Sequence, residues 1–170
     1  MDAADKPVRV LMVCLGNICR SPTAEGVLRH KLVQADLHQQ VLVDSAGTSD
    51  WHEGEPPDAR TIKAAARRGY DLSILRSRPV CNEDFLLHDY ILAMDQQNLL
   101  DLQRRCPAPA HGKLGLLLQH GNHDRLEVPD PYERSAAAFD EVLDLCERAC
   151  AALLQHLIET HPKLRGGRRS

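Results

Sequence analysis

Residues 8–29, VRVLMVCLGNICRSPTAEGVLR, constrain the fold more than any other stretch of the chain. The stretch opens with an apolar, β-branched run that is typical of a buried parallel strand. It closes with Ser21, Pro22 and Glu25, which are residue types that begin helices as a cap, a first-turn proline and a first-turn acid. Residues 14–20 join the two elements. A loop in this position directs its backbone N–H groups and the positive end of the following helix at one point, so the stretch predicts an anion-binding site.

The residue types in this loop indicate which anion chemistry is expected. Cys14 stands at the loop entrance, where the same dipoles stabilise its thiolate form. Gly16 and Asn17 tolerate the left-handed backbone angles that a loop with inward-facing amides requires. The planar fork of Arg20 suits two oxygens of a tetrahedral oxyanion, and Ser21 can hydrogen-bond the sulfur. Together they predict phosphoryl transfer with a thiolate nucleophile. The predicted phosphate-binding residues are Leu15, Gly16, Asn17, Ile18, Cys19, Arg20 and Ser21.

Cys-x5-Arg-Ser is similar to the phosphate loop of cysteine-dependent phosphatases, and VCLGNICRSPTAE resembles the low molecular weight protein tyrosine phosphatases. The likeness continues in DSAGTSDW (44–51), DYILAMD (89–95) and DPY (130–132), so it covers residues 8–158. A buried cysteine before an ordinary turn would explain Cys14 alone but not the combined motif. The resemblance implies a phosphatase that needs no metal or cofactor and acts on phosphotyrosine in proteins, with tyrosine kinases among its candidate substrates.

Strands that alternate with helices predict an α/β fold with a doubly wound, four-stranded parallel sheet, helices on both faces and a single domain. Ligands then bind beyond the carboxyl ends of the strands, and Cys14 follows the first strand directly. The expected strands are residues 8–13, 41–44, 90–94 and 114–118, and the expected helices are residues 22–36, 57 or 58–69, 82–87, 96–104 and 134–156.

The chain has 170 residues and a formal net charge of −3, which suits one domain and favours neither nucleic acid nor an acidic membrane as partner. We expect residues 1–7 to be a flexible leader, 8–158 the phosphatase domain and 159–170 a disordered tail. The leader lacks the apolar core of a secretion signal, so a cytoplasmic protein with free thiols is expected, either a monomer or a weak oligomer. The nine histidines show no compact spacing typical of a metal site.

Phosphoester cleavage by a thiolate also needs an acid that protonates the departing oxygen. The resemblance assigns this role to Asp130 of the DPY motif. From the residues alone, Val128–Pro131 is a stiff loop on the ligand-binding face, yet an aspartate before a proline also opens ordinary turns, and the two interpretations weigh equally. In the implied mechanism Cys14 attacks phosphorus, Arg20 holds the phosphate oxygens, and Asp130 acts first as acid and then as base.

Trp51 and Tyr132 are the candidate walls of a substrate cleft, because aromatic faces on two loops could enclose a phosphotyrosine ring. Core packing is the alternative for a lone tryptophan, but the neighbours of Trp51 show no core periodicity. Ile18 would border the ring, whereas the related arginine phosphatases carry threonine at that position. Glu133 stands where the family often has a second tyrosine, so this chain departs from the pattern there.

Asn17, Ser21 and Ser45 match residues that shape the phosphate loop in relatives, although local turn hydrogen bonds would look similar. Cys19 has two interpretations of equal weight from its chemistry: packing beneath the loop, or a thiol that reacts with an oxidised Cys14. The resemblance favours the second, in which a reversible disulfide protects the nucleophile.

Three other functions compete with the phosphotyrosine phosphatase. A thioredoxin-coupled arsenate reductase would need relay cysteines, but after Cys81 the next cysteine is Cys106. A protein arginine phosphatase would use the same loop on another substrate. A non-catalytic phosphopeptide-binding module would fit the loss of Cys14, Arg20 or Asp130, and all three are present.

Overall fold

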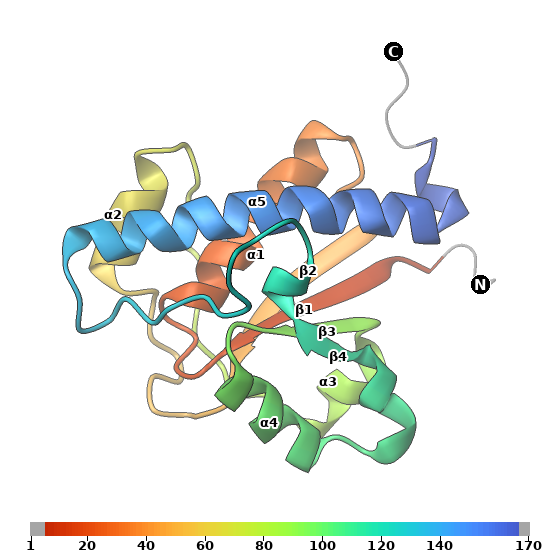
Figure 1. Ribbon diagram of the computed structural model, residues 1–170, viewed down its shortest axis with the longest axis horizontal. Coiled ribbons are helices and arrows are strands. Elements are labelled where there is room, and N and C mark those ends of the chain that lie inside the picture. The colour runs from red at the N-terminus through yellow and green to blue at the C-terminus, as the bar shows by residue number, and fades with distance from the viewer. Residues whose placement is uncertain (1–5, 167–170) are drawn as a thin grey trace.

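A single parallel sheet forms the centre of the molecule in the computed structural model, which describes residues 6–166. Its four strands lie in the order β2-β1-β3-β4, and every neighbouring pair is parallel. This order, with β1 in the interior, is the predicted doubly wound arrangement (Figure 1). The strands are β1 (Val8–Cys14), β2 (Val41–Gly47), β3 (Tyr90–Ala93) and β4 (Leu114–Leu116).

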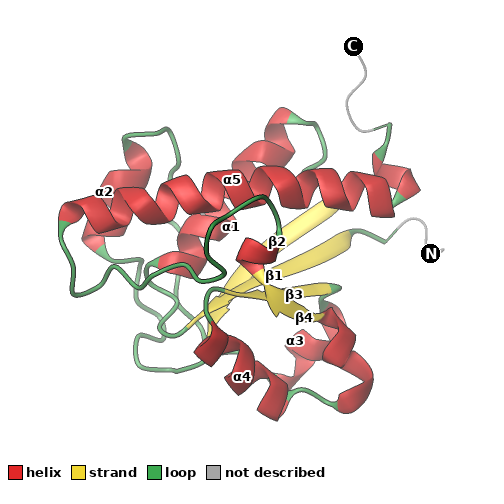
Figure 2. Ribbon diagram, viewed as in Figure 1, coloured by secondary structure: helices red, strands yellow, loops and turns green. Residues whose placement is uncertain are grey.

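Helices cover both faces of the sheet, as predicted. Figures 1 and 2 show α1, α2 and α5 on one side and α3 and α4 on the other. The helices are α1 (Arg20–Gln34), α2 (Ala59–Ala66), α3 (Asn82–Leu87), α4 (Gln96–Arg105) and α5 (Ala136–Thr160), with 3₁₀ turns at Ala108–Lys113, Leu117–Gln119 and Pro162–Leu164. Within residues 6–166, no helix combines the length and the apolar character needed to cross a membrane.

The apolar character of β1 follows from its burial on both faces, because successive strand residues point to opposite sides. Val10 and Met12 join the core formed with α1 and α5, and Cys14 ends the same row. Leu11 and Val13 join the second core, beneath α3 and α4. All five side chains are almost fully buried, and each buried aliphatic side chain contributes about 1.5–3 kcal/mol to the free energy of unfolding.

Helix α1 begins at Arg20, two residues earlier than expected, and its N-cap is Cys19. The prediction that Ser21 caps this helix is therefore wrong. Pro22 still lies in the first turn, where its missing N–H has no intrahelical partner to lose. The early start brings Arg20 and Ser21 onto the first turn of the helix, directly against the phosphate loop.

The carboxyl-terminal part of the fold extends beyond the expected boundary at residue 158. Helix α5 continues to Thr160, and Leu164 in the following 3₁₀ turn is only 1% exposed. Residues 159–166, which were expected to be part of a disordered tail, instead contain the end of α5 and a 3₁₀ turn. Residues 1–5 of the expected leader and 167–170 of the tail lie outside the described residues.

Other element boundaries differ by a few residues. Strand β2 continues to Gly47 rather than ending at Asp44, and β4 ends at Leu116 before a 3₁₀ turn. Helix α2 is shorter than expected and ends at Ala66. The extension of β2 matters for function, because it carries Ser45 and Gly47 up to the end of β1.

Candidate active site

The site is built around the loop that joins β1 to α1. Cys14 is the last residue of β1, and the backbone N–H of Asn17 points at its sulfur, with N and Sγ 3.3 Å apart. Asn17 adopts a left-handed φ of 57°, as its residue type predicted, because the loop must turn its amides inward. The same expectation for Gly16 is wrong, since its φ is not positive. Gly16 instead provides space, because a Cβ there would lie 3.1 Å from the ring of His52.

Gly47 lets β2 approach the phosphate loop closely. A Cβ at this position would lie only 2.7 Å from the carbonyl oxygen of Leu15, so any other residue would displace the loop. The chain beyond Gly47 then pairs with the loop: Thr48 N donates to Cys14 O at 2.9 Å, and Ser49 N donates to Leu15 O at 3.0 Å. Gly47 was not among the predicted site residues, although a glycine at the end of a strand can indicate close approach of another backbone segment.

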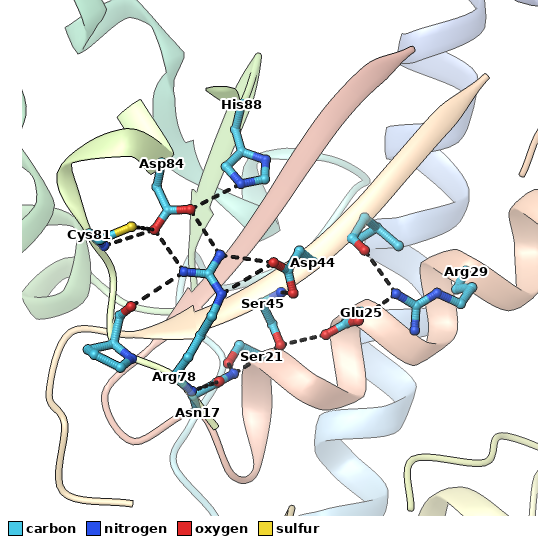
Figure 3. Close-up of polar contacts among 12 residues, drawn as sticks. Asn17, Ser21, Glu25, Arg29, Asp44, Ser45, Arg78, Cys81, Asp84 and His88 are labelled. Carbon is cyan, nitrogen blue, oxygen red and sulfur yellow. Dashed lines mark hydrogen bonds and ion pairs between the residues drawn. The ribbon is translucent and has the colours of Figure 1, made fainter. Parts of the chain in front are cut away.

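The side chain of Asn17 holds two serines in place (Figure 3). Its Nδ2 donates to Ser21 Oγ at 2.8 Å and to Ser45 Oγ at 2.9 Å. The Oγ of Ser21 lies 3.0 Å from Cys14 Sγ. Because Ser21 already accepts from Asn17, its hydroxyl hydrogen can point at the sulfur and stabilise negative charge there.

A buried carboxylate extends this network. Ser45 Oγ donates to Glu25 at 2.6 Å, and Arg29 donates to the other oxygen of Glu25 at 2.6 Å. Burial raises the pKa of Glu25 above its ordinary value, and the bonds from Ser45 and Arg29 offset part of that rise. The prediction that Glu25 is a first-turn acid is wrong, because α1 begins at Arg20 and has no acidic residue in its first turn. The position of Glu25 on the α1 face towards β2 fixes the Ser45 hydroxyl as a donor.

Arg78 connects the loop to α3 on the far side of β2 (Figure 3). Its backbone N–H donates to Asn17 Oδ1 at 3.0 Å, and its guanidinium donates to Asp44 and Asp84 at 2.9 Å each. Asp84 also lies 3.2 Å from the ring of His88. Burial favours the neutral form of Asp84, but the bonds from His88 and Arg78 outweigh it and hold its pKa well below its usual range.

Arg20 is a buried charged residue, with only 3% of its surface exposed, and its guanidinium is held by several polar contacts. One terminal nitrogen donates to Asp95 Oδ2 at 2.6 Å and to the Val128 carbonyl oxygen at 3.1 Å, while the other lies 3.6 Å from Asp130 Oδ2. Burial opposes the charge, but Cys14 and Asp95 raise the pKa of Arg20 above its ordinary value. Asp95 lies two residues beyond the end of β3 and caps α4, which places it at the same end of the sheet as Cys14.

The loop that carries Asp130 is anchored to the end of β3. Val128 is fully buried, and its N–H donates to Met94 O at 2.8 Å. Two residues further on, the Asp130 carboxylate is about half exposed and accepts from the N–H of Tyr132 at 3.1 Å. The loop therefore brings an acid to the carboxyl edge of the sheet, facing the phosphate loop.

Most of the predicted site residues line a cleft of about 550 Å³, whereas Asn17, Ser21 and Ser45 do not line it. Trp51 is 72% exposed and Tyr132 is 44% exposed, so Trp51 is not a core residue. His52 also lines the cleft and was not predicted; its Nδ1 lies 2.5 Å from Glu55. The lining residues are Cys14, Leu15, Gly16, Ile18, Cys19, Arg20, Trp51, His52, Asp130, Tyr132, Glu133 and Arg134.

Cys19 lies at the base of the same loop. Its side chain is buried, and burial raises its pKa to about 12, so the thiol is protonated at neutral pH. All six cysteines are free. Across residues 6–166, no three or more His, Cys, Asp or Glu side chains gather in a way that could hold a metal ion.

A family model described as low molecular weight phosphotyrosine protein phosphatase matches residues 9–163. The chain belongs to this family. Among curated relatives, the human low molecular weight phosphotyrosine protein phosphatase is 40% identical over 148 residues, which are 86% of this chain and 93% of the human protein. The family consists of cysteine-dependent hydrolases of phosphoric monoesters, so the chain is an enzyme of that class, and phosphoproteins are its substrates.

Solved structures agree with this assignment to the low molecular weight phosphatase family. A protein tyrosine phosphatase from Entamoeba histolytica, with Hepes in its active site, superposes with a TM-score of 0.88 at 40% identity, covering 90% of this chain and 98% of that one. A Drosophila arginine phosphatase superposes with a TM-score of 0.78 at 34% identity, covering 86% of this chain and 96% of that one. The fold is thus shared by proteins named for two different phosphoamino acids.

Proposed function

We propose that the enzyme hydrolyses phosphotyrosine in proteins through a phosphocysteine intermediate on Cys14. The observation that carries this proposal is that Cys14, Arg20 and Asp130 line one cleft whose rim contains two exposed aromatic residues. We expect the enzyme to be cytoplasmic and to be a monomer or a weak oligomer, with tyrosine kinases among its candidate substrates.

Two displacement steps follow from the geometry. In the first, the Cys14 thiolate attacks phosphorus, the bond from phosphorus to the phenolic oxygen breaks, and Asp130 gives that oxygen its proton. In the second, the Asp130 carboxylate takes a proton from water as water attacks phosphorus, which releases phosphate and regenerates the thiolate. Arg20 and the loop amides hold the three equatorial oxygens in both steps, and Ser21 stabilises the sulfur as a leaving group.

The cleft walls favour an aromatic phosphoester. Trp51 and Tyr132 offer flat apolar faces, and Ile18 places an aliphatic side chain beside the phosphate loop. A phosphoarginine guanidinium would instead need hydrogen-bond acceptors at the position of Ile18, which the aliphatic side chain lacks. The arginine phosphatase activity is therefore the second candidate.

The arsenate reductase alternative has less support. Neither Cys81 nor Cys106 lines the cleft that contains Cys14, so neither is placed to relay a disulfide from it. Cys81 is exposed at the start of α3, and Cys106 is buried at the end of α4.

Three parallel assays test the proposed function. We expect hydrolysis of p-nitrophenyl phosphate and of a phosphotyrosyl peptide in the presence of EDTA, with a lower kcat/KM for a phosphoarginyl peptide. We expect no arsenate reduction with thioredoxin and its reductase. Dependence on a divalent metal, or a preference for phosphoarginine or arsenate, would contradict the proposal.

A further inference from the structure

Arg60, in the first turn of α2, joins the two halves of the active site without lining its cleft. Its guanidinium binds the Asp58 carboxylate at two points, Nε at 3.0 Å and Nη2 at 2.9 Å. Asp58 in turn donates its backbone N–H to the Ile18 carbonyl oxygen of the phosphate loop at 2.9 Å. One side of Arg60 is thereby fixed relative to the loop that holds the nucleophile.

The other side of Arg60 contacts the loop that carries the acid. Its Nη2 donates to the Tyr132 carbonyl oxygen at 2.8 Å. The guanidinium carbon also lies 5.5 Å from the centroid of the Tyr132 ring and 4.7 Å from that of Phe139 in α5, so the planar group packs between two aromatic faces. A lysine could supply the charge but not the bidentate fork or the stacking.

Tyr132 transmits this constraint to Asp130, because the N–H of Tyr132 donates to Asp130 Oδ1 at 3.1 Å. Within residues 6–166, no side chain other than Arg60 donates a hydrogen bond to the backbone of residues 129–134. Arg60 bonds the Tyr132 carbonyl oxygen and lies over the Tyr132 ring, so moving Arg60 would free the residue whose N–H orients the acid.

We propose that Arg60 is a positioning residue that holds the Asp130 loop in register with the phosphate loop. The proposal rests on the proposed role of Asp130 as general acid. Without Arg60, the carboxyl group would spend less time within reach of the departing oxygen. Catalysis should then suffer most where the leaving group needs a proton and least where it departs unaided.

The test compares Arg60→Met and Arg60→Lys across aryl phosphates whose phenols range from weakly to strongly acidic. For substrates with poor leaving groups, we expect kcat/KM, which reports phosphoryl transfer to Cys14, to fall by roughly 10- to 100-fold in Arg60→Met, less than the complete loss of an acid would cost. For the best leaving groups, the loss in activity should be under about threefold. Arg60→Lys should resemble Arg60→Met, because lysine lacks the bidentate guanidinium that binds Asp58. Arg67→Met, an exposed arginine at the end of the same helix, is the matched control.

A double-variant cycle distinguishes this inference from the proposed function. If Arg60 acts through Asp130, adding Arg60→Met to Asp130→Ala should lower kcat/KM by less than about twofold. An undiminished loss in that background, or an equal loss for every leaving group, would overturn the positioning role while leaving the proposed function intact. Wild-type activity in Asp130→Ala would instead overturn the proposed role of Asp130 as general acid, and the role of Arg60 with it. Asp58→Asn, which keeps the helix cap but weakens the hold on Arg60, should reproduce the leaving-group dependence if Arg60→Met folds poorly.

Discussion

The half-exposed carboxylate of Asp130 faces a sulfur nucleophile and a buried arginine across one cleft. Replacing it by alanine removes the proposed proton donor and leaves the phosphate loop unchanged. We therefore expect Asp130→Ala to lower kcat/KM, which reports the step in which the phenol departs, by about 10²–10⁴-fold for phenyl phosphate, and by much less for esters of strongly acidic phenols. Steady-state kinetics across such a series measures this. A uniform loss for all esters would mean that Asp130 only supports its loop.

Ile18 is the residue expected to discriminate between phosphoamino acids. It lines the cleft and is 8% exposed, so a substrate side chain must pass against it. A threonine hydroxyl at this position can accept a hydrogen bond from a guanidinium, which isoleucine cannot. We expect Ile18→Thr to raise the ratio of phosphoarginine to phosphotyrosine kcat/KM, measured with matched peptides, by about 10-fold, the scale of one hydrogen bond. An unchanged ratio would show that selectivity lies elsewhere in the cleft.

We expect reversible oxidation of the enzyme to depend on Cys19. If peroxide converts Cys14 to a sulfenic acid, attack by the Cys19 thiolate on the Cys14 sulfur forms a disulfide and displaces hydroxide. With a pKa of about 12, Cys19 exposes about tenfold more thiolate for each unit of pH rise, so disulfide formation should accelerate from pH 6 to pH 8. Mass spectrometry should detect a disulfide between residues 14 and 19. Full recovery of oxidised Cys19→Ser by reductant would contradict this role.

At the scale of elements, the ion pairs of Arg78 connect the end of β2 to α3. The pKa of Asp84 in the folded protein is below its ordinary value. Its ionised form therefore stabilises the fold fully at pH values above the ordinary pKa, and this stabilisation is lost as the pH falls towards the lowered pKa. We expect Asp84→Asn to lower the free energy of unfolding by about 3 kcal/mol at pH 7, since it leaves Arg78 and His88 without this partner. Urea unfolding should show the difference shrinking below about pH 4. An equal difference at pH 3 and pH 7 would contradict the electrostatic origin.

The same elements show what sequence patterns could and could not predict. Cys14 and Asn17 were predictable because strand, loop and helix are contiguous, so their geometry follows from local backbone rules. Arg78 and Asp95 were not, because each contact joins segments about 60 or more residues apart, and only the packed sheet brings them together. Asp95 did carry a signal, as an acid directly after a buried strand. Arg60 carried none, since one arginine in an amphipathic helix looks like any other.

At the scale of the whole molecule, alternating strands and helices specified the architecture because parallel strands need long crossover connections. The carboxyl terminus was harder to predict. Leu164 lies among charged and glycine residues, and its burial depends on the end of α5 returning to the core rather than on any periodic pattern. Two loops far apart in sequence complete the cleft, so the site exists only when the sheet is assembled.

Covalent transfer of the phosphoryl group to Cys14 can be tested by trapping the phosphocysteine intermediate. Mixing the enzyme with a phosphotyrosyl peptide in EDTA, followed by a rapid denaturing quench and mass spectrometry, should find one phosphoryl group on the peptide that contains Cys14. Cys14→Ser should show neither the adduct nor turnover, while still binding phosphate through Arg20 and the loop amides. A phosphoryl group on another residue, or hydrolysis by Cys14→Ser, would contradict the account.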